Sequence, residues 1–483
     1  MAWRYCYHGV LYLSLYLRRN IYPEPALAAF NSLERRAALS LSFVYITRMM
    51  GLFLLLPVLS VLARDLDGAT PLLIGLAIGI YALFQALLQI PFGLMSDRFG
   101  RKPVILAGLG VFIVGSIVAA MTDSIWGIIV GRALQGGGAI SAVIMALAAD
   151  LTRDSQRTKI MAVIGVSIGL SFMLSIILGP VLMLRFQLAG IFYFIALSGV
   201  MAALLVWFVV PDPDKINDDR NISVVISEMP MLLQNRELLR IDFGIFILHL
   251  LITASFVCIP LTLLDNGIAV GSHWSVYMYG ALGSLLILLP MIGFAERKLP
   301  VKWVMVSSIG GFAIALFATG SVAGSYVSAI VCMVLFFGFL SVLESLLPSL
   351  ASRTAPASLR GSVMGVYSTS QFFGAFIGGV AGGWLTGVVG SSTALLVLSV
   401  LCLCWLPVAW SMKNPERLSN YRLSLKRSLL EPGTNLAELS RTLSCVPGVV
   451  EVSVVDEAAY LKVSRREFDE QSVIEFQRGP AHQ

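Results

Sequence analysis

Residues 93–103 read Gly-Leu-Met-Ser-Asp-Arg-Phe-Gly-Arg-Lys-Pro, a charged loop between two apolar stretches near 72–96 and 103–121. A transmembrane helix needs about 20 predominantly apolar residues, and both stretches reach that length. The two glycines of the loop, Gly93 and Gly100, favour a tight turn and a close approach of the helices that it joins. The pattern predicts two membrane-spanning helices connected by a short, strongly charged turn.

The composition of the whole chain agrees with a membrane protein. Of its 483 residues 57% are hydrophobic and 13% are charged, whereas about 25% of an average soluble domain is charged. The mean hydropathy is +0.84. One soluble core cannot hide this much apolar surface, so the composition excludes a soluble enzyme, a disordered chain and a nucleic-acid binder as the main identity. The net charge of +6 is typical of basic cytoplasmic loops in membrane proteins.

The apolar segments divide the chain into two similar halves. They are too long for barrel strands, which have about 10 residues and alternate in polarity, so an all-α polytopic fold is expected. Six helices are predicted in 39–210 and six in 240–412, with a cytoplasmic linker at 211–239. Residues 1–38 form an N-terminal extension, and 418–478 form a small polar domain. The segments lie near 39–63, 72–96, 103–121, 124–149, 158–184, 188–210, 240–264, 272–295, 302–320, 325–351, 361–388 and 391–412.

Lys and Arg residues gather in alternate loops. The even-numbered loops carry fifteen of them, whereas the odd-numbered loops carry Arg64 and Arg185. Because basic residues are retained in cytoplasmic loops, this asymmetry places the even loops and both termini in the cytoplasm.

An internal repeat relates the two halves. Arg157 and Met161 recur as Arg360 and Met364 at an offset of 203 residues, and the same offset carries the first helix onto the seventh. Two six-helix halves with parallel topology are typical of major facilitators.

The N-terminal extension holds one apolar segment, Val10–Leu17, that is too short to span a membrane. No cleavage site of small residues follows it closely, so it is a poor secretory signal. It is either a membrane-surface segment or a stretch that is present only because the translation start is placed too early. Asn31 and Glu34, three residues apart, predict a capping box at the start of the first long helix.

The loop at 93–103 resembles the signature loop of the major facilitator superfamily, Gly-x-x-x-Asp-Arg-x-Gly-Arg-Lys, in full. The stretches 48–53, 89–94, 131–136 and 364–372 are also similar to a bacterial member of that family. The resemblance covers nearly all of the chain after residue 31. It implies a twelve-helix fold in a bacterial inner membrane, with helices 1, 4, 7 and 10 lining a central cavity.

The charges of the loop suggest a gate. Asp97 stands at the membrane edge, on the side where helix 11 begins near Gly361 and presents its positive dipole end. The resemblance implies that Arg101 pairs with an acid at the end of helix 4, for which Asp150 is the candidate. We expect this cluster to hold the two halves together and to favour an outward-open state. The retention of basic residues in cytoplasmic loops is enough to explain Arg98, Arg101 and Lys102, but it does not explain the acids. A degenerate copy of the loop occurs in the second half at Gly293–Lys298.

Four ionisable residues fall inside apolar segments, one on each helix expected to line the cavity: Arg48, Arg132, His249 and Glu344. Such residues cost several kcal/mol at mid-bilayer and mark functional sites. Glu344 is the best candidate to bind and release a proton, and His249 is the second.

The two arginines cannot plausibly lose their protons, so they are interpreted as counter-charges to Glu344 or to an anionic group. A structural role for Arg132, and for His249, is an equally open alternative. Gln85 and Gln371, with Tyr81, Gln89 and Tyr367, could line the path or simply pack helices. Leu182, Met183 and Leu184 replace glycines expected in the antiport motif of helix 5, which weakens the analogy with antiporters.

The C-terminal piece reads as a small α+β domain. Strands are predicted at Tyr421–Leu425, Val449–Val455 and Ala459–Val463, with a helix at Leu436–Leu443. The segment after Cys445 is similar to ferredoxin-like metal-chaperone domains, but the metal-binding Cys-x-x-Cys is missing. No metal or cofactor is therefore expected. The domain could serve as a regulatory module, as a self-association module or as a passive cap.

Together these features predict a secondary transporter that works by alternating access, with proton-coupled efflux of a small organic compound or drug as the first hypothesis. Proton-coupled uptake and a membrane sensor are the alternatives. A primary pump is disfavoured because no Gly-x-x-x-x-Gly-Lys-Ser/Thr loop occurs, and no catalytic triad suggests an enzyme. The expected partners are a small-molecule substrate, protons and the lipid bilayer, and no nucleic acid.

Overall fold

The computed structural model describes residues 30–153, 156–211, 234–297, 300–355, 360–413, 418–424, 441, 443–455, 458–464 and 468. The chain forms two compact units, Met1–Met412 and Lys413–Gln483. The predicted segment at 10–17, most of the linker at 211–239 and most of the helix at 436–443 lie outside the described residues.

The first half of the larger unit begins with the predicted capping box. The Asn31 side chain accepts a hydrogen bond from the Glu34 backbone, and Glu34 accepts one from the Asn31 backbone. The elements that follow are α2 (Ser32–Phe53), α3 (Leu59–Leu62), η1 (Ala63–Asp65), α4 (Pro71–Phe99), α5 (Arg101–Ala120), α6 (Ile125–Gly137), α7 (Ser141–Asp150) and α8 (Arg157–Phe208).

The long element α8 contains two helices. Gln187 has φ +54° and ψ −165°, a conformation that breaks the helical path between the predicted segments at 158–184 and 188–210. The predicted helix at 124–149 is divided into α6 and α7 by Gly138, Ala139 and Ile140.

The second half repeats the pattern. Its elements are α10 (Arg236–Asp265), η3 (Val270–Ser272), α11 (His273–Arg297), α12 (Val301–Val322), α13 (Tyr326–Thr354), α14 (Arg360–Val389) and α15 (Ser391–Ser411). Helices α8 and α14 begin at Arg157 and Arg360, the two arginines that the 203-residue repeat relates.

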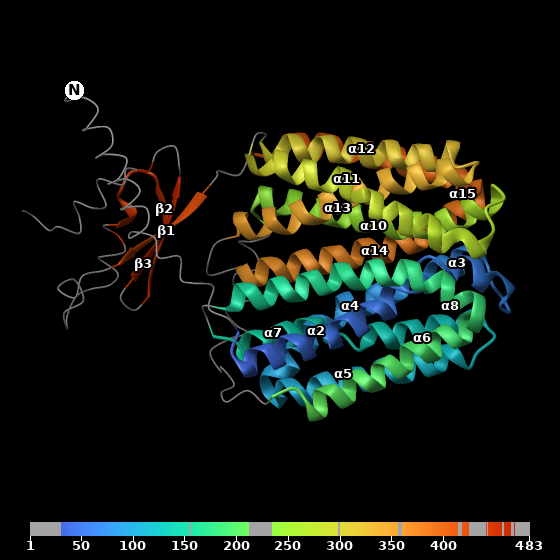
Figure 1. The fold of residues 1–483 in the computed structure, drawn as a ribbon, viewed down its shortest axis with the longest axis horizontal. Helices are drawn as coiled ribbons and strands as arrows, with labels where there is room; N and C mark the ends of the chain where they lie inside the picture. Colours follow the sequence, from blue (N-terminus) through green and yellow to red (C-terminus); the bar gives the residue numbers. More distant parts are fainter. Residues whose placement is uncertain are drawn as a thin grey trace, which may run out of the picture. The chain divides into compact units, whose positions relative to one another are not determined.

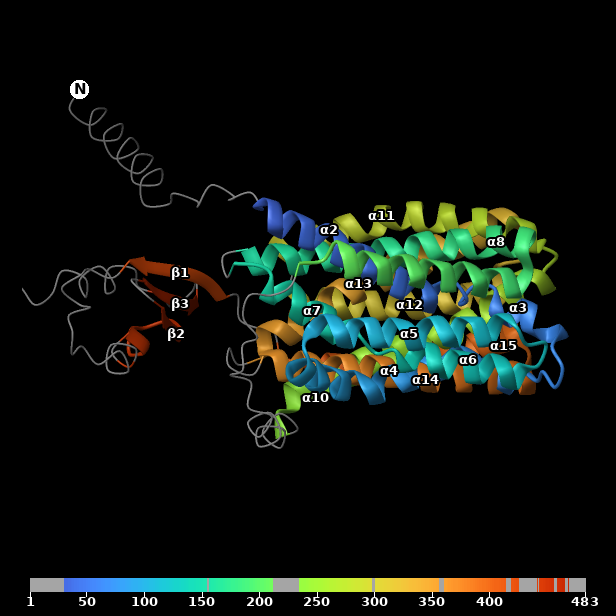
Figure 2. The same ribbon diagram turned by 90° about the horizontal axis from the view of Figure 1, so that it is seen from below.

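Ten helices in the described part of the chain are long and apolar enough to cross a membrane. One of them is α8, which holds two spans, and α2 with α3 supplies one more. The twelve-helix expectation is thereby confirmed. Figure 1 shows α11, α12 and α13 on one side of α4 and α14, with α5 and α6 on the other. The turned view shows the same helices running along one common direction (Figure 2).

Helices α4 and α14 form the seam between the halves. Their backbones approach closely because small residues face each other: a Cβ on Gly75 would lie 2.2 Å from the Gly379 carbonyl oxygen, and one on Gly383 2.4 Å from the Pro71 oxygen. These residues lie toward the end of the bundle that holds η1, which we call the Arg64 end. The opposite end, which holds the turn between α4 and α5, is the Arg101 end.

The buried cores differ between the two ends. One large core joins both halves and includes Leu54–Leu56 near the Arg64 end together with much of α10 and α13. Phe172 of α8 reaches across the seam, with ring centroids 6.1 Å from Phe256 and 6.3 Å from Phe337. Toward the Arg101 end, a second core contains first-half residues alone, from Ala37 to Val210. The halves are therefore packed together at the Arg64 end and have separate cores at the other.

The smaller unit contains an antiparallel sheet with strand order β1-β3-β2. Strands β1 (Leu418–Ser424), β2 (Val449–Val455) and β3 (Ala458–Ser464) match the three predicted strands closely. Leu443, Ala459, Leu461 and Val463 form its own small core. The order agrees with the first strands of a β-α-β-β-α-β domain, as predicted.

Candidate functional site

The turn between α4 and α5 places a buried cation between two acids. Gly100 has φ +90° and ψ 153°, a conformation that glycine adopts without a Cβ penalty, and α5 begins at the next residue. Arg101 is 6% exposed and pairs with Asp97 one turn earlier. Its Nε also donates to Asp150 Oδ2 over 3.0 Å. The predicted contact between Arg101 and Asp150 is present, and both acids belong to the same half as Arg101.

A buried serine supports this arginine. The Arg101 guanidinium donates to Ser96 Oγ over 2.6 Å, and Ser96 Oγ donates to the Gly93 carbonyl oxygen over 2.6 Å. Ser96 is fully buried. The sequence predicts no role for Ser96, since one serine in a charged loop carries no distinctive signal.

The other predicted residues of this turn lie at its surface or in open space. Arg98 stacks over the Phe99 ring, 5.4 Å from its centroid, and Lys102 Nζ donates to the Val210 carbonyl oxygen over 3.0 Å. A Cβ on Gly93 would meet nothing within 4 Å. The close helix approach expected at Gly93 is therefore wrong for this conformation. The side chains of residues 296–299 in the second-half copy lie outside the described residues.

A second ion pair ties the start of α2 to the segment after α7. Glu34 is 1% exposed, and Arg153 donates to its two carboxylate oxygens over 2.8 Å each. The Asn31 backbone donates to the same carboxylate over 2.9 Å. The hydrogen bonds from Arg153 lower the pKa of Glu34 to about 2, against the opposing effect of burial. Glu34 precedes the apolar part of α2, and its role beyond the capping box was missed because Arg153 is 119 residues away.

Three polar side chains from three helices meet in the second half. His249 of α10 lies between Glu344 of α13 and Gln371 of α14. The His249 Nε2 atom is 3.4 Å from Glu344 Oε1 and 2.7 Å from Gln371 Nε2. The sequence predicted all three as separate candidates, and only the fold brings them together. The Glu344 side chain is 36% exposed and that of His249 16%, so the cluster is reached by solvent.

One ring nitrogen of His249 therefore faces two partners. A neutral imidazole nitrogen can accept a hydrogen bond from the Gln371 amide nitrogen, and it then offers no proton to Glu344. A protonated Nε2 would donate to Glu344, and Gln371 would have to present its oxygen instead. The cluster thus has two hydrogen-bonded arrangements, which differ in whether Nε2 carries a proton.

Two more ionisable residues lie on the helices of this cluster. Tyr367 of α14 lies one turn before Gln371. It is 3% exposed, and its hydroxyl has no hydrogen-bond partner among the described residues. Asp242 lies on α10 two turns before His249, toward the Arg101 end. Its seven-residue spacing from His249 was the signal that could have revealed it, but its position close to the predicted helix start concealed it.

Arg48 and Arg132 lie in the first half, away from this cluster. Both are fully buried. Arg48 donates to Tyr81, to Gln85 and, over 3.0 Å, to the Gln135 carbonyl oxygen. Arg132 donates to the Gly51 carbonyl oxygen over 2.8 Å and to Gln135 Oε1 over 2.9 Å.

The two guanidinium groups flank one aromatic ring. They lie 5.2 Å and 4.7 Å from the centroid of Tyr81. No ion pair joins either arginine to Glu344 within the described part of the chain. Their contacts connect α2, α4 and α6. The proposed pairing of these arginines with Glu344 is thus absent, and the helix-bridging alternative accounts for their contacts.

Gln85 and Gln371 also differ in their surroundings. Gln85 accepts from Arg48 and donates to Ser141 Oγ over 3.2 Å, so it is occupied within the first half. Gln371 belongs to the second-half cluster. A third amide, Gln89, crosses the seam and donates to Thr369 Oγ1 over 3.2 Å. Among the described residues, no three His, Cys, Asp or Glu side chains gather as a metal site would require.

Comparison with known proteins agrees with this architecture. The sequence profile of the Major Facilitator Superfamily matches residues 41–288 and 241–444. The chain is 42% identical over 435 residues to the inner membrane transport protein YajR of Escherichia coli strain K12, covering 90% of this chain and 95% of that protein. It is 24% identical over 377 residues to the multidrug resistance protein MdtL of Klebsiella pneumoniae, covering 74% and 91% of the two chains.

A solved structure shares the fold at low sequence identity. The D-xylose-proton symporter superposes with a TM-score of 0.66 at 12% identity, covering 80% of this chain and 99% of that one. The family profile and the relative in Escherichia coli, together with twelve helices in two repeated halves, lead to one conclusion. The chain belongs to the major facilitator superfamily and is a multi-pass membrane transporter.

Proposed function

We propose that this protein exports a small organic compound across a bacterial inner membrane in exchange for protons. The observation that carries the proposal is the His249–Glu344–Gln371 cluster, in which one histidine nitrogen faces a carboxylate and an amide. A partly exposed acid that shares a proton with a histidine can load and unload that proton as the cavity changes sides.

Export is favoured by the relatives. MdtL is a multidrug resistance protein, and the class B tetracycline resistance protein of Escherichia coli is 36% identical over 136 residues, covering 28% of this chain and 33% of that protein. A membrane transporter confers resistance by removing a drug from the cell, so the substrate class that we infer is amphipathic organic compounds. The positive-inside asymmetry supports cytoplasmic termini and a cytoplasmic Arg101 end.

Alternating access supplies the mechanism. The halves share a core at the Arg64 end and keep separate cores at the Arg101 end, as expected for a transporter that faces the cytoplasm. In the outward-facing state the Arg101 end would close, and α14 would approach the open space beside Gly93. Arg101 would then hold Asp97 in place for the start of α14, whose dipole attracts the carboxylate.

Transport in proteoliposomes with an imposed pH gradient tests the proposal, with tetracycline and other amphipathic compounds as probes. The wild type should accumulate probe against its gradient when the proton gradient is imposed. Glu344→Gln should lose this accumulation while keeping downhill exchange, because the side chain can no longer release a proton. Ser345→Ala is the matched control, since it alters the exposed neighbour of Glu344. Accumulation by the Glu344→Gln variant equal to the wild type would refute the coupling, and movement in the opposite direction would establish uptake instead.

A further inference from the structure

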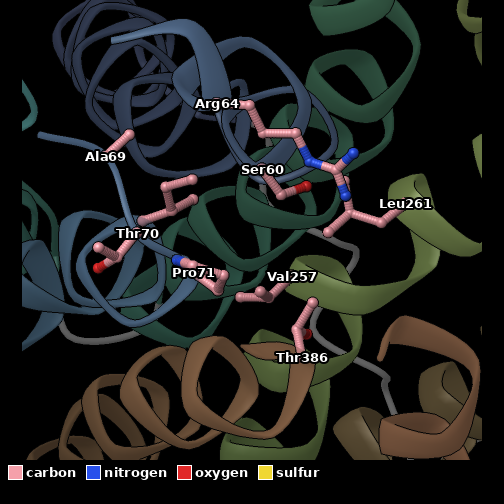
Figure 3. A pocket seen from close by; sticks show the side chains of 9 residues that line it. Ser60, Arg64, Ala69, Thr70, Pro71, Val257, Leu261 and Thr386 are labelled. Atoms are coloured by element: carbon pink, nitrogen blue, oxygen red, sulfur yellow. The ribbon is translucent and has the colours of Figure 1, made fainter. Parts of the chain in front are cut away.

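A small cavity lies at the Arg64 end, away from the proton cluster, with mainly apolar walls that carry a few polar groups. It has a volume of about 100 Å³, and its walls come from both halves of the transporter. The first half supplies Ser60 of α3, Arg64 of η1 and residues 69–71 and 74 around the start of α4. The second half supplies Val257 and Leu261 of α10 and Thr386 of α14. Figure 3 shows the guanidinium of Arg64 and the hydroxyl of Ser60 pointing into the same space.

Three of the four polar side chains in the wall can donate a hydrogen bond into the cavity, and the fourth, Thr386, already donates to the Gly382 carbonyl oxygen over 2.7 Å. Ser60 is fully buried, and its hydroxyl has no hydrogen-bond partner among the described residues. Thr70 Oγ1 already accepts from the Leu73 backbone over 3.3 Å, so its own proton remains available. Arg64 is the one charged residue in the cavity wall. Helix α4 begins here after its N-cap Thr70, and the positive end of its dipole adds to the field of Arg64.

We propose that this cavity binds a small monovalent inorganic anion such as chloride. An unpartnered buried hydroxyl costs free energy unless a ligand accepts its hydrogen bond. One arginine balances one negative charge, and apolar Val257 and Leu261 favour a weakly hydrated ion over a multivalent one. The volume admits a chloride ion with a few water molecules and is too small for a bulky organic anion.

The position of the cavity gives the anion a second effect. Because the walls come from both halves, the cavity exists in this form only while the Arg64 end is closed. An anion bound there would stabilise that closed state by mass action. Binding itself does not depend on the proposed proton coupling, so the two proposals can fail separately.

The test measures thermal unfolding of the purified full-length protein in neutral detergent. Sodium chloride is titrated against sodium gluconate at constant ionic strength, so that screening stays fixed. The wild type should show a saturable rise in unfolding temperature with chloride. Ser60→Ala should weaken the apparent chloride affinity severalfold, and Arg64→Gln should weaken it at least tenfold. Arg185→Gln is the matched control, since it removes another basic residue predicted on this side but absent from the cavity wall.

Each outcome decides the proposal. A chloride response that is retained in Arg185→Gln and lost in Arg64→Gln supports it. Equal responses to chloride and gluconate in the wild type, or an unchanged response in Arg64→Gln, would overturn it. If Arg64→Gln cannot be purified, two other single variants replace it. Arg64→Lys keeps the positive charge and should retain chloride binding. An unchanged chloride affinity in Ser60→Ala would overturn the proposal.

Discussion

At the scale of single residues, the surroundings of each charge separate structural roles from proposed functional ones. Arg48, Arg132, His249 and Glu344 look alike in the sequence, each being an ionisable residue within an apolar segment. The two arginines are enclosed by carbonyl, amide and aromatic groups, whereas Glu344 is open to solvent and faces His249. Partial exposure is what a group needs if it is to exchange protons with both sides of a membrane.

Asp242→Asn tests whether a second acid on the helices of the cluster serves proton transfer. Asp242 lies on the same helix as His249, two turns closer to the Arg101 end, so it is placed to pass protons toward that end. We expect the rate of proton-driven transport to fall about tenfold, equivalent to about 1.4 kcal/mol of activation free energy, while the binding of probe is unchanged. Asn235→Asp, at the N-cap of the same helix, is the control for charge near this end. An unchanged rate in Asp242→Asn would remove Asp242 from the proton path.

Glu34→Gln tests the ion pair at the start of α2. The carboxylate accepts two hydrogen bonds from the Arg153 guanidinium, and hydrogen bonds to charged groups contribute about 1.5–3 kcal/mol. We therefore expect the variant to lose about 2 kcal/mol of unfolding free energy at pH 7, measured by denaturation in mild detergent. Glu237→Gln breaks a pair with Arg240 whose carboxylate is 23% exposed, against 1% for Glu34, and should cost less than about 1 kcal/mol.

The pH dependence of this difference follows from the sign of the pKa shift. The pKa of Glu34 falls from 4.5 to about 2 on folding. A carboxyl group with a depressed pKa stabilises the fold fully above its unfolded pKa and loses that contribution as the pH falls toward its folded pKa. The stability difference between wild type and Glu34→Gln should be constant from pH 7 to about pH 5 and shrink below pH 4.5. A difference that shrinks already between pH 7 and 6 would contradict this assignment.

At the scale of secondary-structure elements, the close contact of α4 with α14 sets the state of the Arg64 end. Gly75 and Gly79 of α4 face Gly379 and Gly383 of α14, and their backbones meet without intervening side chains. A Cβ on Gly79 would lie 2.6 Å from the Phe376 carbonyl oxygen. Such contacts cannot relax by a rotamer change, since the obstructing atom belongs to the backbone. The helices would have to separate.

Gly75→Ala should therefore open the Arg64 end. Spin labels at the exposed positions Leu72 and Val388 would report the distance between the two helices. This distance is measured by double electron–electron resonance in a cysteine-free background. We expect a longer mean distance in Gly75→Ala than in the wild type. Gly110→Ala is the matched control, because a Cβ there meets nothing within 4 Å. An identical distance distribution in Gly75→Ala would show that the contact does not determine closure.

At the scale of the whole molecule, the chain consists of a membrane unit and a separate polar unit. Each has its own core, and the core of the smaller unit consists of Leu443, Ala459, Leu461 and Val463. Within the membrane unit, the halves repeat the same helix order, which gives alternating access a symmetric basis.

Truncation after Met412 tests whether the polar unit supports the membrane unit. We expect the shortened protein to insert, to purify as a single species and to unfold within about 3 °C of the full chain, because the two large cores contain no residue after Met412. If the polar unit mediates self-association, light scattering should show a larger mass for the full chain than for the truncated one. The control is a full-length chain with Leu461→Ser, a substitution in the core of the polar unit. If the truncated protein aggregates while this control stays soluble, independent folding of the membrane unit is contradicted.

The sequence by itself determined the features that depend on local pattern. Hydrophobic length predicts the helices, and the repeat predicts their division into halves. The glycine at position 100 predicts the tight turn, in which it adopts a positive φ. The pair Asn31 and Glu34 predicts the start of the first helix. The three strands of the polar unit also follow from local alternation and turns. These features involve neighbours along the chain, so their physical causes can be read without the fold.

The tertiary structure alone decided which distant residues meet. It joined His249, Glu344 and Gln371, and it separated Arg48 and Arg132 from Glu344. It also paired Glu34 with Arg153 and enclosed the cavity beside Arg64 between the halves. The face that a helix turns toward its neighbours depends on how all twelve helices pack. Small residues at the seam and side-chain volumes across it set that packing, and no single segment contains this information.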